Sequence, residues 1–301
     1  MPLSSDAVES LIAARVAQAP ADAPGWEVLT AGLKTARELL GEQAVVASFA
    51  IGSLAHGGFV PAVSDVDVAL ILDEVRDDTD TRMAEVRRRV KEQFGTPLAA
   101  RLSIFWASWE GLTRHTRRGR FPLVDQYDLL HHGLLLTGED HRSQVTLPSG
   151  EALRDGFIAE AASFMLEKLA VPTRDPLLLS ATYLVSQGLR EVAKAVLFPV
   201  RFLFTADVGT LATNAEAVAH YLERRKGPAS ALVREAGRWR DEGLGEAAAV
   251  QKALRAGLLP LHRELVETYR AHLLRMGRAE LAQGLAQWWE RLERSAIAPR
   301  A

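Results

Sequence analysis

Cysteine is absent from this chain of 301 residues, and its absence excludes several kinds of site. The protein can form no disulfide and no thiolate zinc site or iron–sulfur cluster, and it has no cysteine nucleophile. Any metal ion that it binds must therefore be held by oxygen or imidazole ligands.

The chain also lacks a strong excess of either charge and any long apolar run. Its 38 acidic and 36 basic residues leave a net charge of −2, so there is no global attraction to nucleic acid or anionic lipid. No stretch reaches the roughly 18 apolar residues that a membrane-spanning helix needs. Residues 1–18 lack the basic start and apolar core of a secretory signal. We therefore expect a cytoplasmic protein with no membrane partner and no nucleic-acid partner.

The apolar pattern of the first half predicts a small mixed sheet with helices. Helical spacing predicts three helices, over residues 4–18, 26–40 and 77–94. Short runs that are rich in β-branched residues predict three strands, over residues 44–51, 65–72 and 100–107.

From Gly150 onward, Leu, Ala and Arg recur at helical spacing almost to the end of the chain, which predicts an all-helical second domain. Helix breaks are expected near the prolines and glycines of this half: Pro172, Pro199, Gly227, Gly243 and Pro260. The polar stretch 137–150 predicts the boundary, with domains over 1–147 and 148–301. The predicted fold class is α+β.

The segment 52–67 (GSLAHGGFVPAVSDVD) carries the clearest chemical pattern. Asp65 and Asp67 are alternate residues at the start of a predicted strand, so both carboxylates should lie on one face. Two close carboxylates repel each other unless they share a cation. Mg²⁺ suits them because it takes oxygen ligands from one or two carboxylates, water and phosphate. Such a metal ion can orient an in-line displacement at phosphorus.

Gly52 and Ser53 precede this pair and could position a phosphate. Glycine permits close backbone approach, and a serine that begins a helical turn offers a hydroxyl and backbone N–H groups. Taken alone, each pattern is more often an ordinary turn or a solvated acidic pair. Here Gly-Ser follows one predicted strand, and Ser-Asp-x-Asp leads into the next after a loop. This order brings the Gly-Ser turn and the aspartate pair to the same end of a two-strand unit, as a metal–triphosphate site requires.

These residues resemble the nucleotidyltransferase superfamily with the fold of DNA polymerase β, and within it the streptomycin/spectinomycin adenylyltransferases. The shared pattern is Gly-Ser, Gly-Gly, a proline and Ser-Asp-x-Asp, here with one extra loop residue. Residues 127–140 look like the helix and strand that close such a domain. The resemblance implies two Mg²⁺ ions held by Asp65 and Asp67, with ATP as substrate. It also implies nucleotide contacts from Gly52, Ser53 and Ser64, and a helical domain that closes on substrate and nucleotide.

Two positions depart from this family. A third carboxylate on a later strand normally acts as the base, but Arg101 aligns there, which leaves Glu110 and then Asp128 as replacement candidates. In the helical domain, Arg201, Gly209 and Ala217 match a family stretch in which Asn214 replaces the lysine that would reach the phosphates. The resemblance thus implies a family member that lacks an obvious base and a phosphate-binding cation.

Two further patterns are better explained by ordinary structure. The basic run 114–120 (RHTRRGR) could bind a triphosphate, but a solvated loop is the favoured interpretation. Arg255 and His262 match the Arg-x6-His spacing of HEPN ribonucleases, a match that is common by chance in arginine-rich helical chains.

The predicted function is a Mg²⁺-dependent nucleotidyltransferase that moves AMP from ATP to a hydroxyl group of a small acceptor. The resemblance points to an aminoglycoside-like antibiotic as that acceptor. The alternative is a catalytically weak or inactive nucleotide-binding regulator, or a partner protein of the toxin–antitoxin type. The two departures from the family pattern motivate this alternative.

Overall fold

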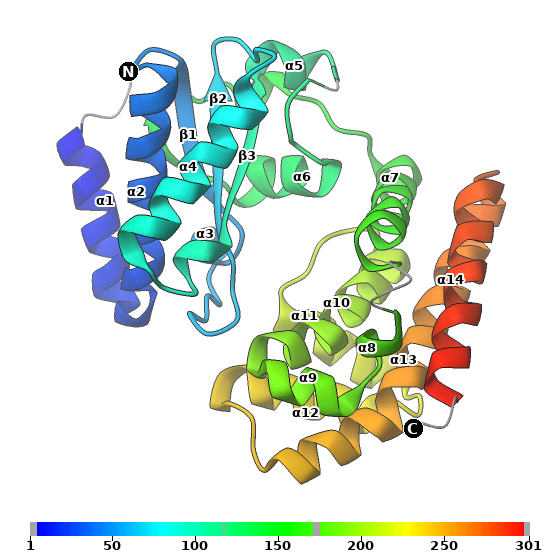
Figure 1. Cartoon of the computed structure of the whole chain (residues 1–301). Helices are drawn as coiled ribbons and strands as arrows, with labels where there is room; N and C mark the ends of the chain where they lie inside the picture. Colours follow the sequence, from blue (N-terminus) through cyan, green and yellow to red (C-terminus); the bar gives the residue numbers. More distant parts are fainter. Residues whose placement is uncertain (1–4, 117, 171–174, 298–301) are drawn as a thin grey trace. The chain divides into compact units, whose positions relative to one another are not determined.

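The computed structural model of the chain describes residues 5–116, 118–170 and 175–297. The chain divides into two compact units, Met1–Leu147 and Pro148–Ala301, which we describe separately (Figure 1). Among the described residues, no helix combines the length and the apolar character that crossing a bilayer requires.

A four-stranded sheet forms the centre of the first unit, in the order β3-β2-β1-β4. The strands are β1 (Val45–Ile51), β2 (Val66–Leu72), β3 (Leu102–Ser108) and β4 (Leu134–Gly138). β1 runs antiparallel to both β2 and β4, whereas β2 and β3 are parallel. The sheet is therefore small and mixed, and the predicted α+β fold class is confirmed.

Helices cover both faces of this sheet. The N-terminal part contributes α1 (Ser5–Gln18), α2 (Ala23–Leu40) and α4 (Thr79–Phe94), of which α2 and α4 lie side by side over one face (Figure 1). Between and after the strands come α3 (Ser53–His56), α5 (Trp109–Thr113) and α6 (Leu123–His132). Val66, Val68 and Leu70 of β2 pack in the core on the α2/α4 side. Ala69 and Ile71 pack in a second core with Leu129 of α6.

The second unit is helical throughout its regular structure, as its sequence predicts. Its α-helices are α7 (Gly150–Phe164), α8 (Asp175–Leu178), α9 (Ala181–Gln187), α10 (Leu189–Val208), α11 (Asn214–His220), α12 (Ser230–Glu242), α13 (Ala247–Arg275) and α14 (Ala279–Ile297). Short π-helical turns extend α7 and α11 at Met165–Leu169 and Tyr221–Arg225. α10, α12 and α13 pack against one another, and α14 packs along α13.

Two of the predicted helix breaks are wrong. Pro199 lies inside α10 and Pro260 lies inside α13, so both helices continue through a proline. A proline removes one backbone hydrogen bond and crowds the preceding turn, yet a helix with apolar packing on several sides can retain it. Gly243, in contrast, ends α12 as predicted, while Pro172 lies outside the described residues.

Candidate active site

The turn after β1 brings Gly52 and Asp67 into direct contact. Ile51 pairs with Asp67 across the antiparallel β1/β2 ladder, and Gly52 follows with φ +65° and ψ −154°. A Cβ atom on Gly52 would lie 2.5 Å from Oδ2 of Asp67. The group that approaches Gly52 closely is therefore the Asp67 carboxylate. Gly52 itself has a backbone conformation that is nearly confined to glycine.

We expect Gly52→Ala to lower the free energy of unfolding by about 2 kcal/mol. Alanine is strained by 1–3 kcal/mol in this backbone region, and its Cβ would displace the Asp67 carboxylate. Gly245→Ala is the matched control, because a Cβ there meets nothing within 4 Å. Urea unfolding of the two variants measures the difference. Equal stability would show that the Gly52 turn relaxes without strain.

Asp65 and Asp67 stand at the start of β2, where the sequence predicts them. Asp65 immediately precedes the strand and Asp67 is its second residue, and both are half-buried. Val66 and Val68 point into the α2/α4 core, so the alternation of the strand places Asp67 on the opposite face. That face is covered by α6.

Asp128 of α6 is a third carboxylate at this end of the sheet. The residue is only 9% exposed, and its Oδ2 accepts a hydrogen bond of 2.5 Å from the Gly52 N–H. Because Asp67 and Asp128 both contact Gly52, their Oδ2 atoms lie within about 7.5 Å of each other. The structure thus brings the second of the two replacement candidates close to Asp67. It also shows that the Gly52 N–H, predicted to contact phosphate, is bonded to a carboxylate.

Glu110, the first replacement candidate, lies elsewhere. β3 is parallel to β2, and Ser108 at its end is opposite Leu72, about 17 Å along the strands from Asp67. Glu110 follows in α5, where its exposed carboxylate forms an ion pair with Arg114 at 2.5 Å. The residue that pairs with Asp67 on β3 is Ser103, a hydroxyl in place of a carboxylate.

Arg101, which aligns with the family's base, lies in the turn before β3 and supports the loop that leads into Asp65. Its guanidinium donates a hydrogen bond of 2.7 Å to the Ser64 carbonyl and another to the Pro61 carbonyl. The Ser64 hydroxyl, a predicted nucleotide contact, accepts a hydrogen bond of 3.0 Å from the Val60 N–H. Both residues therefore shape the loop between α3 and β2.

Arg120 belongs to the basic run that the sequence predicts as a solvated loop, and the residue is exposed overall although its guanidinium is partly covered. Its guanidinium lies 4.6 Å from the centroid of the Phe105 ring and donates a 2.5 Å hydrogen bond to the Ile104 carbonyl. Burial lowers the pKa of Arg120, while the negative charges of Asp125 and Asp67 act in the opposite direction. Arg120 therefore belongs to the electrostatic surroundings of Asp67.

The donor set at Asp65 and Asp67 fits Mg²⁺ as a partial coordination shell. Both donors are carboxylate oxygens, and Mg²⁺ commonly takes its remaining ligands from water and substrate phosphate. In the part of the chain that the structure describes, no group of three or more His, Asp or Glu side chains is arranged to hold a metal ion. Binding through this pair would therefore depend on ligands that the nucleotide brings.

The remaining predicted residues have simple structural settings. Ser53 begins α3, directly after Gly52. Asn214 begins α11 in the second unit, where Thr213 and Glu216 form a capping box. His262 is 3% exposed, and its Nδ1 lies 3.1 Å from the Leu258 carbonyl. A buried imidazole of this kind cannot meet a nucleic acid, so the Arg255/His262 spacing forms no accessible ribonuclease site.

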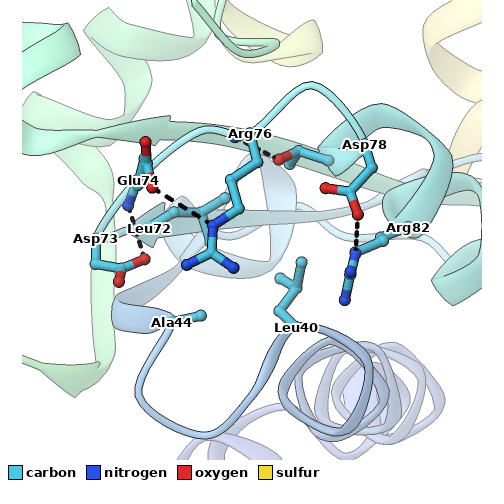
Figure 2. A pocket seen from close by; sticks show the side chains of 9 residues that line it. Leu40, Ala44, Leu72, Asp73, Glu74, Arg76, Asp78 and Arg82 are labelled. Carbon is cyan, nitrogen blue, oxygen red and sulfur yellow. Dashed lines mark hydrogen bonds and ion pairs between the residues drawn. The ribbon is translucent and has the colours of Figure 1, made fainter.

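A small hollow lies at the opposite end of β2 from Asp67 (Figure 2). Its polar lining is already paired: Arg82 contacts Asp78 at 2.7 Å, and Arg76 contacts Glu74 at 3.5 Å. Leu40, Ala44 and Leu72 supply its apolar wall. Because three acidic residues (Asp73, Glu74 and Asp78) outnumber the two arginines in the lining, the hollow offers no net attraction to a triphosphate.

Comparison with solved structures finds a likeness that covers most of the chain. No protein-family model matches the sequence, and no curated protein matches it either. The structure is similar to the crystal structure of spectinomycin adenyltransferase AAD(9) from Enterococcus faecialis with ATP and spectinomycin, with a TM-score of 0.53 and 11% sequence identity. The likeness covers 76% of this chain and 99% of that one. The chain therefore has a nucleotidyltransferase-like fold, with an α+β domain followed by a helical domain.

Proposed function

We propose that this protein is a Mg²⁺-dependent nucleotidyltransferase that moves AMP from ATP to a hydroxyl group of a small molecule. The observation that carries the proposal is the close contact between the Gly52 turn and the Asp67 carboxylate. Asp67 lies at the start of β2, two residues after Asp65. The fold supports it, because the similar structure contains an adenyltransferase with ATP and spectinomycin. An aminoglycoside-like antibiotic is accordingly the first class of acceptor to test.

In the proposed reaction, the acceptor oxygen forms a bond to the α-phosphorus of ATP while the bond from that phosphorus to pyrophosphate breaks. The acceptor hydroxyl releases its proton to water, and the products are the adenylylated acceptor, pyrophosphate and that proton. Asp65 and Asp67 would hold Mg²⁺, which neutralises phosphate charge when bound. Ser53 would orient the β- and γ-phosphates at the start of α3.

A direct assay tests the proposal. We expect purified protein to transfer label from α-labelled ATP to a member of a panel of aminoglycosides and other hydroxylated small molecules, provided Mg²⁺ is present. EDTA should abolish the transfer and excess Mg²⁺ should restore it, because the carboxylate pair needs the metal ion to accept a triphosphate. Transfer that persists unchanged in EDTA would contradict the assignment of Asp65 and Asp67.

A second candidate function is supported by the residue opposite Asp67. Ser103 pairs with Asp67 on β3 and offers a hydroxyl that cannot act as a carboxylate base, which favours a nucleotide-binding regulator or a partner protein of the toxin–antitoxin type. Such a protein would bind Mg²⁺–ATP tightly and leave all acceptors unlabelled. The same assay, combined with a measurement of ATP binding by calorimetry, separates the two functions.

A further inference from the structure

A histidine lies at the end of the short helix that begins at Ser53. His56 closes α3, and its side chain keeps 27% of its surface exposed. Its Nε2 atom lies 4.0 Å from Oδ1 of Asp128, and its ring packs edge-on to His132 at a centroid distance of 5.6 Å. The imidazole therefore stands between solvent and a buried carboxylate.

Asp128 is held in place by its second oxygen. Oδ2 accepts the hydrogen bond from the Gly52 N–H, which fixes the carboxylate beside the turn and leaves Oδ1 on the side of His56. A carboxylate at this separation attracts an imidazole whenever the ring carries a proton on both nitrogens. The pair thus places an imidazole ring at the surface beside a buried carboxylate.

Ser53 and His56 are three residues apart in one helical turn, so their side chains lie on neighbouring positions of the helix surface. A phosphate beside the Ser53 hydroxyl is therefore within reach of the imidazole. We infer that His56, oriented by Asp128, binds the β- and γ-phosphates of the nucleotide. This inference rests on the proposed function.

In-line displacement distinguishes a residue that binds the outer phosphates, as inferred for His56, from a residue that acts as the base. In a displacement at the α-phosphorus, the acceptor oxygen enters on the side opposite the leaving pyrophosphate. A residue on the pyrophosphate side contacts the leaving group and cannot reach the acceptor proton. His56 should consequently affect the binding of ATP and leave the binding of AMP unchanged, because AMP lacks the two outer phosphates.

Calorimetry with Mg²⁺–ATP and with AMP tests the inference. We expect His56→Gln to raise the Kd for ATP about tenfold or more, the range for a lost charge-assisted hydrogen bond, with no change in the Kd for AMP. His56→Lys should restore most of the ATP affinity because it restores a positive charge. His141→Gln is the matched control, since His141 pairs with Glu139 after β4 and should leave both affinities unchanged.

Each other outcome is diagnostic. Equal weakening of ATP and AMP would show that His56 only supports the fold of the turn, and thermal unfolding of the same variants would reveal the accompanying loss of stability. Unchanged ATP affinity with reduced labelling would place His56 in proton transfer. Either result overturns the inference while the proposed function stands. If the wild-type protein neither binds ATP nor forms labelled product, both fail together.

Discussion

Replacing Asp67 with asparagine should lower nucleotide transfer by about three orders of magnitude. A metal ion that stabilises charge in the transition state contributes several kcal/mol, and about 4 kcal/mol corresponds to about 10³-fold in rate. Asparagine has nearly the same shape as aspartate, so it should keep the contact with Gly52 while removing the charge that is proposed to hold the metal ion. The rate of formation of labelled product from α-labelled ATP measures the loss.

Asp73→Asn is the matched control for this experiment. Asp73 directly follows the other end of β2 and is exposed, where its carboxylate accepts a hydrogen bond from the Glu74 N–H. The same substitution there removes a charge from the same strand without touching the Gly52 turn. We expect Asp65→Asn to behave like Asp67→Asn. If Asp67→Asn and Asp73→Asn transfer nucleotide equally well, the site lies elsewhere in the protein.

The local part of the site could be predicted because it depends on short-range patterns. The alternation of Val66 and Val68 with Asp67 settles which face of β2 the carboxylate occupies once the apolar residues are buried. Gly52 and Ser53 begin a helical turn directly after an apolar strand, and α3 starts at the predicted residue. These features need only the periodicity of the chain and the chemistry of neighbouring residues.

Short-range patterns place the third carboxylate, Asp128, only second of the two replacement candidates. Asp128 reaches Gly52 from 76 residues away, through the packing of α6 over the sheet. Proximity to the third strand favoured Glu110, but the parallel direction of β3 carries Glu110 away from Asp67. Whether a strand runs parallel or antiparallel to its neighbour is set by the tertiary fold. The apolar pattern of the strand is the same in both cases and does not distinguish them.

The contacts of charged residues near the site depend on the fold for a related reason. Arg120 belongs to the basic run that the sequence predicts as a solvated loop and is exposed, and its guanidinium contacts Phe105 and the Ile104 carbonyl. Arg101 occupies the aligned position of a catalytic acid and instead holds the Pro61 and Ser64 carbonyls. A long arginine side chain can reach backbone acceptors far along the chain, so its role depends on the surrounding fold.

Acidification from pH 7 to pH 4 should cost the second unit about 3 kcal/mol of unfolding free energy through His262 alone. Burial lowers the pKa of this imidazole from 6.5 to about 4, although the backbone hydrogen bond to Leu258 acts in the opposite direction. In the unfolded chain the His262 imidazole takes up a proton near pH 6.5, whereas in the folded chain this imidazole stays neutral until about pH 4. Stability from this group is therefore fully present above pH 6.5 and is lost as the pH falls toward 4.

His262→Leu tests this prediction, because leucine keeps a buried side chain of similar bulk and cannot take up a proton. The difference in unfolding free energy between pH 7 and pH 4 should be smaller by about 3 kcal/mol in this variant than in the wild-type protein. His115→Gln, at an exposed position of the first unit, should leave that difference unchanged. An NMR titration supplies an independent readout, in which His262 should stay neutral at pH 5. A resonance that titrates near pH 6.5 would show that the imidazole reaches water, and the ribonuclease-like spacing with Arg255 would then deserve a direct assay.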